Sequence, residues 1–319
     1  MDKSQKLIFI FSLFLLGISC NGSKEKPVDQ PAIVELASEV KVVSLPDIPI
    51  MVTDPEQRVE YLVQHYWDNT SFADTAILDY KDQLEQGWAD YLDLMCRVRL
   101  SSGVESVTAL MQRLGQAPAV YRYFVELADK YLYDPNSPFR SEEIYIPVLE
   151  SMIASPLLSE LEKIRPEERL RLAKKNRPGT KALNFTYTLA SGVQGTLHGI
   201  KADYTLLFVN NPGCHACAEY INGLKQSQII NELLDTGKLK ILSFYTDTEL
   251  DEWKNHLGDF PDIWINGYDK SQAVSTGNIY DLKAIPTLYL LDKNKTVILK
   301  DAPLQTVEMW LFQKVGNNG

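Results

Sequence analysis

"YTLLFVNNPGCHACAEY", residues 204–220, joins an apolar run to two cysteines that lie three positions apart. The run at residues 204–209 predicts a buried strand, and the residues after the first cysteine predict a helix. Cys214 and Cys217 therefore lie where a strand ends and a helix begins. Such a pair can be a redox centre, half of a metal site, a haem attachment site or two thiols without a function.

The residues near the pair favour one of these alternatives. Covalent haem attachment needs a histidine directly after the second cysteine, and Ala218 stands there. A structural zinc site needs two more ligands at a comparable spacing, whereas His65, His198 and His256 are scattered singly. A redox dithiol needs only the pair, and a helix N-terminus favours negative charge on the first sulfur. We therefore predict a redox dithiol without a metal or a cofactor.

Strands and helices alternate on both sides of this stretch, over about residues 177–319. We expect a hairpin before residue 197, a strand at 204–209, a helix that ends near Gly237, and a strand in "LKILSFYTD". A helix at about 249–257, the paired strands "PTLYLLD" and "KTVILKD" and a last helix follow. This order predicts an α/β domain with a mixed sheet.

The strand, CxxC and helix, with "AIPTLYLLD" downstream, resemble the thioredoxin fold, and the hairpin "ALNFTYTLASG" is similar to the TlpA-like branch of membrane-tethered disulfide reductases. The resemblance covers residues 177–319. It implies that Cys214 is the nucleophile and Cys217 the resolving thiol. It also implies that the Ile285–Pro286 bond is cis and lies against the dithiol, where both residues contact the substrate.

At three positions near the dithiol, the sequence differs from the pattern of these families. Gly213 replaces the tryptophan that usually precedes the first cysteine, and Phe208 replaces a buried aspartate of the preceding strand. Glu219 is one residue short of the helix position at which TlpA-like proteins often carry a glutamate, so its role is not transferred. His215 could favour the thiolate and contact the substrate, but an exposed side chain without a role explains it equally well.

The part before residue 177 is predicted to be a helical bundle over residues 54–176. Asp54 can cap a first helix that opens with Pro55, and further helices are expected near 104–115, 141–154 and 159–175. Cys96 ends an apolar stripe that begins at Trp88, which predicts a buried structural thiol. "RVEYLVQHYWDNTSF" resembles an uncharacterised domain that precedes thioredoxin-like domains in bacterial lipoproteins, a resemblance that implies no activity.

The first residues are typical of an export signal. Lys3 and Lys6 precede the apolar block "LIFIFSLFLLGI", so we expect a signal peptide over residues 1–19. The sequence before Cys20 loosely resembles a bacterial lipobox, which implies that Cys20 carries lipid; the alternative is an ordinary signal peptide with a leftover thiol. Residues 20–53 are then a tether and linker, partly ordered at "IVELA" and "VKVVSL".

Composition restricts the partners. The chain has 319 residues, enough for two domains, and its net charge of −10 without a basic tract argues against nucleic acid. We expect a membrane-anchored protein that faces the periplasm, reduces protein disulfides in the cell envelope and draws electrons from a thiol donor. The isoleucine before Pro286 resembles reductants more than oxidants. Two alternatives are a scaffold lipoprotein with a vestigial or sensing dithiol and a metal-handling protein of the same fold.

Overall fold

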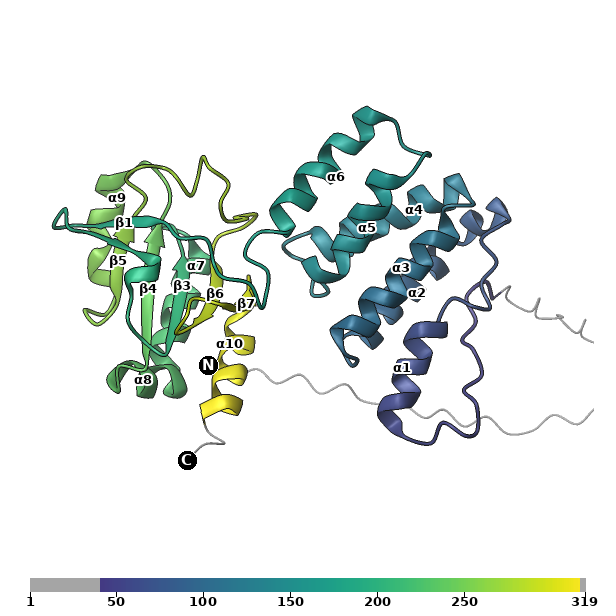
Figure 1. Cartoon of the computed structure of the whole chain (residues 1–319), viewed down its shortest axis with the longest axis horizontal. Coiled ribbons are helices and arrows are strands. Elements are labelled where there is room, and N and C mark those ends of the chain that lie inside the picture. Colours follow the sequence, from purple (N-terminus) through teal and green to yellow (C-terminus); the bar gives the residue numbers. More distant parts are fainter. Residues whose placement is uncertain (1–40, 316–319) are drawn as a thin grey trace, which may run out of the picture. The chain divides into compact units, whose positions relative to one another are not determined.

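The computed structural model describes residues 41–315, in which a helical region precedes an α/β region (Figure 1). The helical region is built from eight elements: α1 (Pro55–His65), η1 (Thr75–Tyr80), α2 (Lys81–Met95), α3 (Leu100–Leu114), α4 (Pro118–Ala128), the π-helical turn η2 (Asp129–Tyr133), α5 (Glu142–Ala154) and α6 (Glu160–Ala173). None of the helices described between residues 41 and 315 is both long enough and apolar enough to cross a membrane.

Local capping residues decide where several of these helices begin. The Asp54 carboxylate accepts a hydrogen bond from the Gln57 N–H at 2.9 Å, and Pro55 occupies the first turn of α1. Ser159 and Glu162 form a reciprocal capping box at the start of α6. The helices predicted near 141–154 and 159–175 are therefore confirmed as α5 and α6.

Aromatic side chains fill the core of the helical region. Phe124 of α4 packs edge-on against Trp67, Phe72 and Trp88, with ring centroids 5.3, 5.4 and 5.7 Å away. Edge-to-face pairs of this kind add to the stabilisation from burial, by about 0.5–1.5 kcal/mol each. This cluster explains why the aromatic residues recur at helical spacing in the sequence.

Cys96 does not belong to that core, and the prediction of a buried structural thiol is wrong. Helix α2 ends at Met95, and Cys96 is its exposed C-cap residue. Cys96 keeps helical backbone angles and its N–H still donates to the carbonyl of Leu92, but the buried side chains of α2 end at Met95.

The start of the described chain packs against the helical region. The N–H of Val42 donates to the side-chain oxygen of Gln83 at 3.1 Å, and Val43 lies against Gly87 of α2. Asn69 donates to the carbonyl of Leu45 at 3.1 Å. The last part of the expected linker thus has fixed contacts, whereas "IVELA", the signal segment and Cys20 lie outside the described residues.

The α/β region is a seven-stranded mixed sheet with the order β2-β1-β5-β4-β3-β6-β7 (Figure 1). Strands β3, β4 and β5 are parallel, and the remaining pairings are antiparallel. The strands are β1 (Thr186–Leu189), β2 (Gln194–Thr196), β3 (Tyr204–Val209), β4 (Leu239–Tyr245), β5 (Ile265–Tyr268), β6 (Thr287–Asp292) and β7 (Val297–Lys300). The other elements are η3 (Leu197–Gly199), α7 (His215–Gln226), α8 (Gln228–Asp235), α9 (Leu250–Asn255), η4 (Leu257–Asp259) and α10 (Leu304–Val315).

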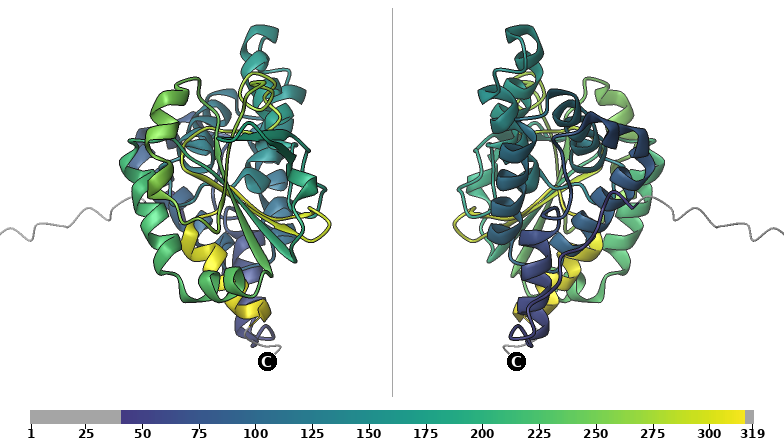
Figure 2. Two further views of the ribbon diagram at one scale, coloured as in Figure 1. Left: turned by 90° about the vertical axis from the view of Figure 1, so that its left-hand side faces the viewer. Right: turned by 90° about the vertical axis from the view of Figure 1, so that its right-hand side faces the viewer.

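Strand β3 is buried on both faces of the sheet. Its side chains point alternately to the two faces, and each face is covered by a core. Leu206 and Phe208 join the core beneath α7, α8 and α10, which cover that face of the sheet (Figure 2). Leu207 and Val209 join the core on the other face, together with Phe185. Strand β3 is thereby fixed on both sides, and it ends at Val209, shortly before the dithiol.

Two details of this region differ from the expectation. The single helix expected to end near Gly237 is two helices, α7 and α8, with extended backbone at Ser227. Leu224 and Ile230 are six positions apart, which in one straight helix would place them on different faces, so the break lets both reach the core. Strand β5 was not expected from the sequence; its Gly267 leaves room for the ring of Tyr187, which would lie 2.9 Å from an added Cβ.

Candidate redox-active site

The loop between β3 and α7 places Cys214 at the end of the sheet. Asn210 anchors the exit of β3, because its side chain donates to the carbonyl of Phe208 at 3.0 Å and to the hydroxyl of Ser243 at 2.8 Å. Gly213 has a φ of 72°, a conformation that a residue with a Cβ adopts only with strain. The chain can therefore turn into α7 directly after Pro212, with Cys214 as its N-cap.

The two cysteines occupy different environments. The Sγ of Cys214 is half-buried and accepts a hydrogen bond from the N–H of Cys217 at 3.4 Å. Cys217 is only 1% exposed, and both are free thiols. An accessible sulfur at a helix N-terminus and a buried sulfur one turn later can play different parts in disulfide exchange.

Burial also determines the protonation state of Cys217. Desolvation raises the pKa of Cys217 to about 12, against a smaller lowering by a hydrogen bond from the backbone of Asn211. Cys217 is therefore a neutral thiol near pH 7 in the reduced protein. The sequence offered no signal for the contribution of Asn211, because it is a backbone contact.

The Ile285–Pro286 peptide is cis, as the resemblance implied. The carbonyl oxygen of Ile285 lies 3.9 Å from the Sγ of Cys214, so the thiol can donate to it. At the start of β6, the hydroxyl of Thr287 donates to the carbonyl of Ala284 at 2.6 Å. The structure thus brings Cys214, Cys217 and the Ile285–Pro286 turn together at one end of the sheet.

Neither Phe208 nor Glu219 supplies an acid beneath the dithiol. Phe208 is fully buried and stacks on Tyr220 of α7, with ring centroids 6.5 Å apart. The side chain of His215 is 90% exposed and its Nδ1 lies 3.6 Å from an oxygen of Glu219, which is itself exposed. These two polar residues therefore form a surface pair on α7.

Other candidate groups lie away from the dithiol. His65 pairs with Asp68 at 2.7 Å on the surface of the helical region. Within residues 41–315, no three His, Cys, Asp or Glu side chains are grouped closely enough to hold a metal ion.

Comparisons with known proteins agree with this arrangement. A family model described as thioredoxin-like matches residues 202–297, and a domain of unknown function, DUF5106, matches residues 19–176. The crystal structure of a thioredoxin-like protein from Bacteroides caccae is 56% identical over 86% of this chain and 99% of that chain, with a TM-score of 0.83. The chain belongs to the thioredoxin-like proteins.

Two further solved structures cover less than half of this thioredoxin-like protein. The C-terminal domain of an uncharacterized protein from Bacteroides fragilis is 67% identical over 43% of this chain and 97% of that chain, with a TM-score of 0.42. The thioredoxin domain of a thiol-disulfide oxidoreductase from Bacteroides vulgatus is 21% identical over 42% and 98% of the respective chains, with a TM-score of 0.38. Among curated proteins no significant match was found.

Proposed function

We propose that this protein is a thiol–disulfide oxidoreductase that reduces disulfides of cell-envelope proteins. The observation that supports the proposal most directly is the placement of the Cys214 sulfur, at the start of α7 and against the Ile285 carbonyl, with a buried partner thiol at Cys217. This arrangement separates an attacking sulfur from a resolving sulfur. A scaffold role for the helical region requires neither feature.

The proposed reaction proceeds through one covalent intermediate. The Cys214 thiolate attacks one sulfur of the substrate disulfide, that S–S bond breaks, and the other substrate sulfur leaves as a thiolate that takes up a proton. Cys217 then loses its proton and attacks the Cys214 sulfur, which releases the second substrate thiolate. The substrate gains two electrons, and the protein keeps a Cys214–Cys217 disulfide that a dithiol donor must reduce.

The substrate chain is proposed to bind beside Ile285 and Pro286, with the exposed ring of His215 as a further contact. The reducing direction rests on the isoleucine that precedes Pro286. Location in the envelope rests on the first 20 residues, which are typical of an exported lipoprotein with lipid on Cys20. The folded part would then face the periplasm on a tether.

Insulin reduction by the purified protein tests this function. We expect the wild-type protein to reduce insulin disulfides in the presence of dithiothreitol, and Cys214→Ser to abolish that activity. Equilibration with glutathione buffers gives the direction: a potential near that of thioredoxin, about −270 mV, supports a reductase, whereas one near about −120 mV indicates an oxidant. Equal insulin reduction by the wild type and Cys214→Ser would exclude the proposed chemistry.

A further inference from the structure

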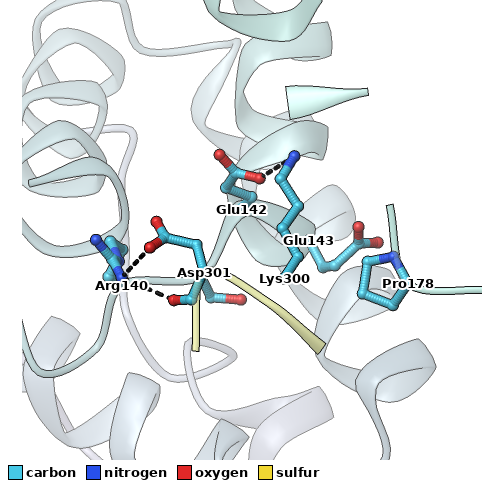
Figure 3. Close-up of a pocket in the computed structure, with 7 residues that line it drawn as sticks. Arg140, Glu142, Glu143, Pro178, Lys300 and Asp301 are labelled. Carbon is cyan, nitrogen blue, oxygen red and sulfur yellow. Dashed lines mark hydrogen bonds and ion pairs between the residues drawn. The ribbon is translucent and has the colours of Figure 1, made fainter. Parts of the chain in front are cut away.

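Glu142 connects the helical region to two lysines of the α/β region. It lies in the first turn of α5, and its carboxylate is ion-paired with Lys283. The same carboxylate is ion-paired with Lys300 at 2.6 Å (Figure 3). The side chains of Glu142, Lys283 and Lys300 are 12%, 9% and 5% exposed. These charges are thus nearly excluded from water.

A second carboxylate is ion-paired with Lys283. Asp281 lies 2.9 Å from its ammonium nitrogen, and the ring of Tyr133 lies 4.9 Å below it. Burial raises the pKa of Glu142, but attraction to Lys300 and Lys283 outweighs it, and the net shift is downward. Glu142 is therefore ionised at neutral pH, and its loss would remove the ion-pair partner of Lys300 and leave Lys283 paired with Asp281.

Lys283 belongs to the segment that faces the dithiol. Two residues further along, the carbonyl of Ile285 lies 3.9 Å from the Cys214 sulfur. The other partner of Glu142, Lys300, pairs across β7 and β6 with Tyr289, two residues after β6 begins at Thr287. The carboxylate of Glu142 therefore contacts both the segment 281–286, through Lys283, and strand β7, through Lys300.

We infer that Glu142 is a positioning residue, which acts through Lys283 to hold the substrate-contacting segment 281–286 beside Cys214. This inference rests on the proposed function, since it assigns that segment to substrate binding. Glu142 does not contact either sulfur in the structure. Its effect should therefore appear in the KM for protein disulfides, and the reaction of Cys214 with a small disulfide should change little.

The neighbouring residue of the same helix provides a matched control. Glu143 is paired instead with Arg177, whose Nε and Nη2 each donate to one of its two carboxylate oxygens, with Oε1 and Nε 2.9 Å apart. Glu142 and Glu143 both line a pocket of about 170 Å³, together with Arg140, Pro178, Lys300 and Asp301 (Figure 3). Glu143→Gln thus removes a carboxylate from the same pocket without releasing Lys283.

The experiment compares Glu142→Gln with Glu143→Gln in the full protein. For Glu142→Gln we expect kcat/KM with insulin to fall about tenfold through a higher KM, and the rate with oxidised glutathione to stay within about twofold of wild type. Glu143→Gln should change neither rate. Equal losses on insulin and glutathione disulfide, or no loss for Glu142→Gln, would overturn the inference.

Two further measurements separate this inference from the proposed function. In a cycle with Lys283→Met, the double variant should be no slower on insulin than Glu142→Gln alone, because both changes act through one pair. Amide hydrogen exchange of residues 281–288 should be about tenfold faster in Glu142→Gln, whether or not the protein is a reductase. Unchanged amide hydrogen exchange in Glu142→Gln would overturn the positioning role of Glu142. A wild type that does not reduce insulin would overturn only the proposed redox function.

Discussion

The sulfur of Cys214 lies 3.9 Å from the carbonyl oxygen of Ile285, a residue 71 positions later in the chain. On its other side, the sulfur faces the N–H of Cys217 at 3.4 Å. The thiol can donate to the carbonyl, and the thiolate can accept from the N–H. Both protonation states of Cys214 therefore have a hydrogen-bond partner in the same position, which suits a sulfur that alternates between them.

Removal of the resolving thiol should trap the covalent intermediate. In Cys217→Ala, we expect mixed disulfides with envelope proteins to accumulate on non-reducing gels, since Cys214 can attack but is not displaced. Adding Cys214→Ser to this variant should remove the trapped species. Cys96→Ala should leave them unchanged, because Cys96 lies at the end of α2 in the helical region and is not part of the dithiol at the start of α7. Trapping that depends on Cys96 would contradict the assignment of the nucleophile.

Stability at alkaline pH should report the burial of Cys217. Its pKa of about 12 in the folded protein lies above the ordinary thiol value, so its contribution to stability is complete below about pH 8.5 and is lost as pH rises towards 12. Between pH 8 and pH 10, the reduced wild type should lose about 2 kcal/mol of unfolding free energy relative to Cys217→Ala. Urea unfolding under a reductant measures this difference, and parallel pH profiles for the two proteins would refute it.

Asp301 should contribute less stability at neutral pH than in acid. Burial raises its pKa to about 6 although Arg140 lies 3.2 Å away and lowers it. A raised pKa favours folding below about pH 4, and this contribution disappears as pH rises through 6. Asp301→Asn should therefore gain about 2 kcal/mol relative to wild type between pH 4 and pH 7.5.

Asparagine is a suitable replacement because residue 301 has a φ of 48°, which asparagine tolerates. It also keeps the hydrogen bond from Arg140 to the backbone carbonyl of residue 301, at 2.9 Å. Urea unfolding at both pH values is the measurement. A wild type that becomes more stable than Asp301→Asn as pH rises would show that the ion pair outweighs burial.

The anchor can be tested independently of the fold. If Cys20 carries lipid, Cys20→Ser should leave the protein uncleaved or absent from the membrane fraction, because lipid attachment at this position requires the thiol. Fractionation followed by immunoblotting distinguishes the two forms. The same distribution for wild type and Cys20→Ser would favour an ordinary signal peptide.

Local signals explain which parts of the fold were predictable. Asp54 and the apolar run of β3 carry their information within a few residues, and the elements they predict are present. Strand β5 could not be expected because Asn266 and Gly267 have low strand propensity, and its place depends on the ring of Tyr187 from another strand.

The dithiol and the Ile285–Pro286 turn could be located from the sequence, because short motifs mark both. The link between Glu142 and Lys283 spans 141 positions and joins two common residue types, so no local pattern marks it. Cys96 was misassigned for a related reason. Helical spacing shows which face of a helix a residue occupies, but it does not show how far along the helix the core extends; here it ends at Met95.

Phe208 has a consequence for the rate of the second step of disulfide exchange, in which Cys217 displaces the substrate. The ring of Phe208 lies against Tyr220 of α7, at the strand position where the thioredoxin pattern has a carboxylate, and an aromatic ring offers no general base. In the proposed mechanism, the proton of Cys217 then passes to solvent or to a small buffer molecule before the second displacement. We expect the protein to dissociate slowly from each partner, at a rate that rises with the concentration of buffer base.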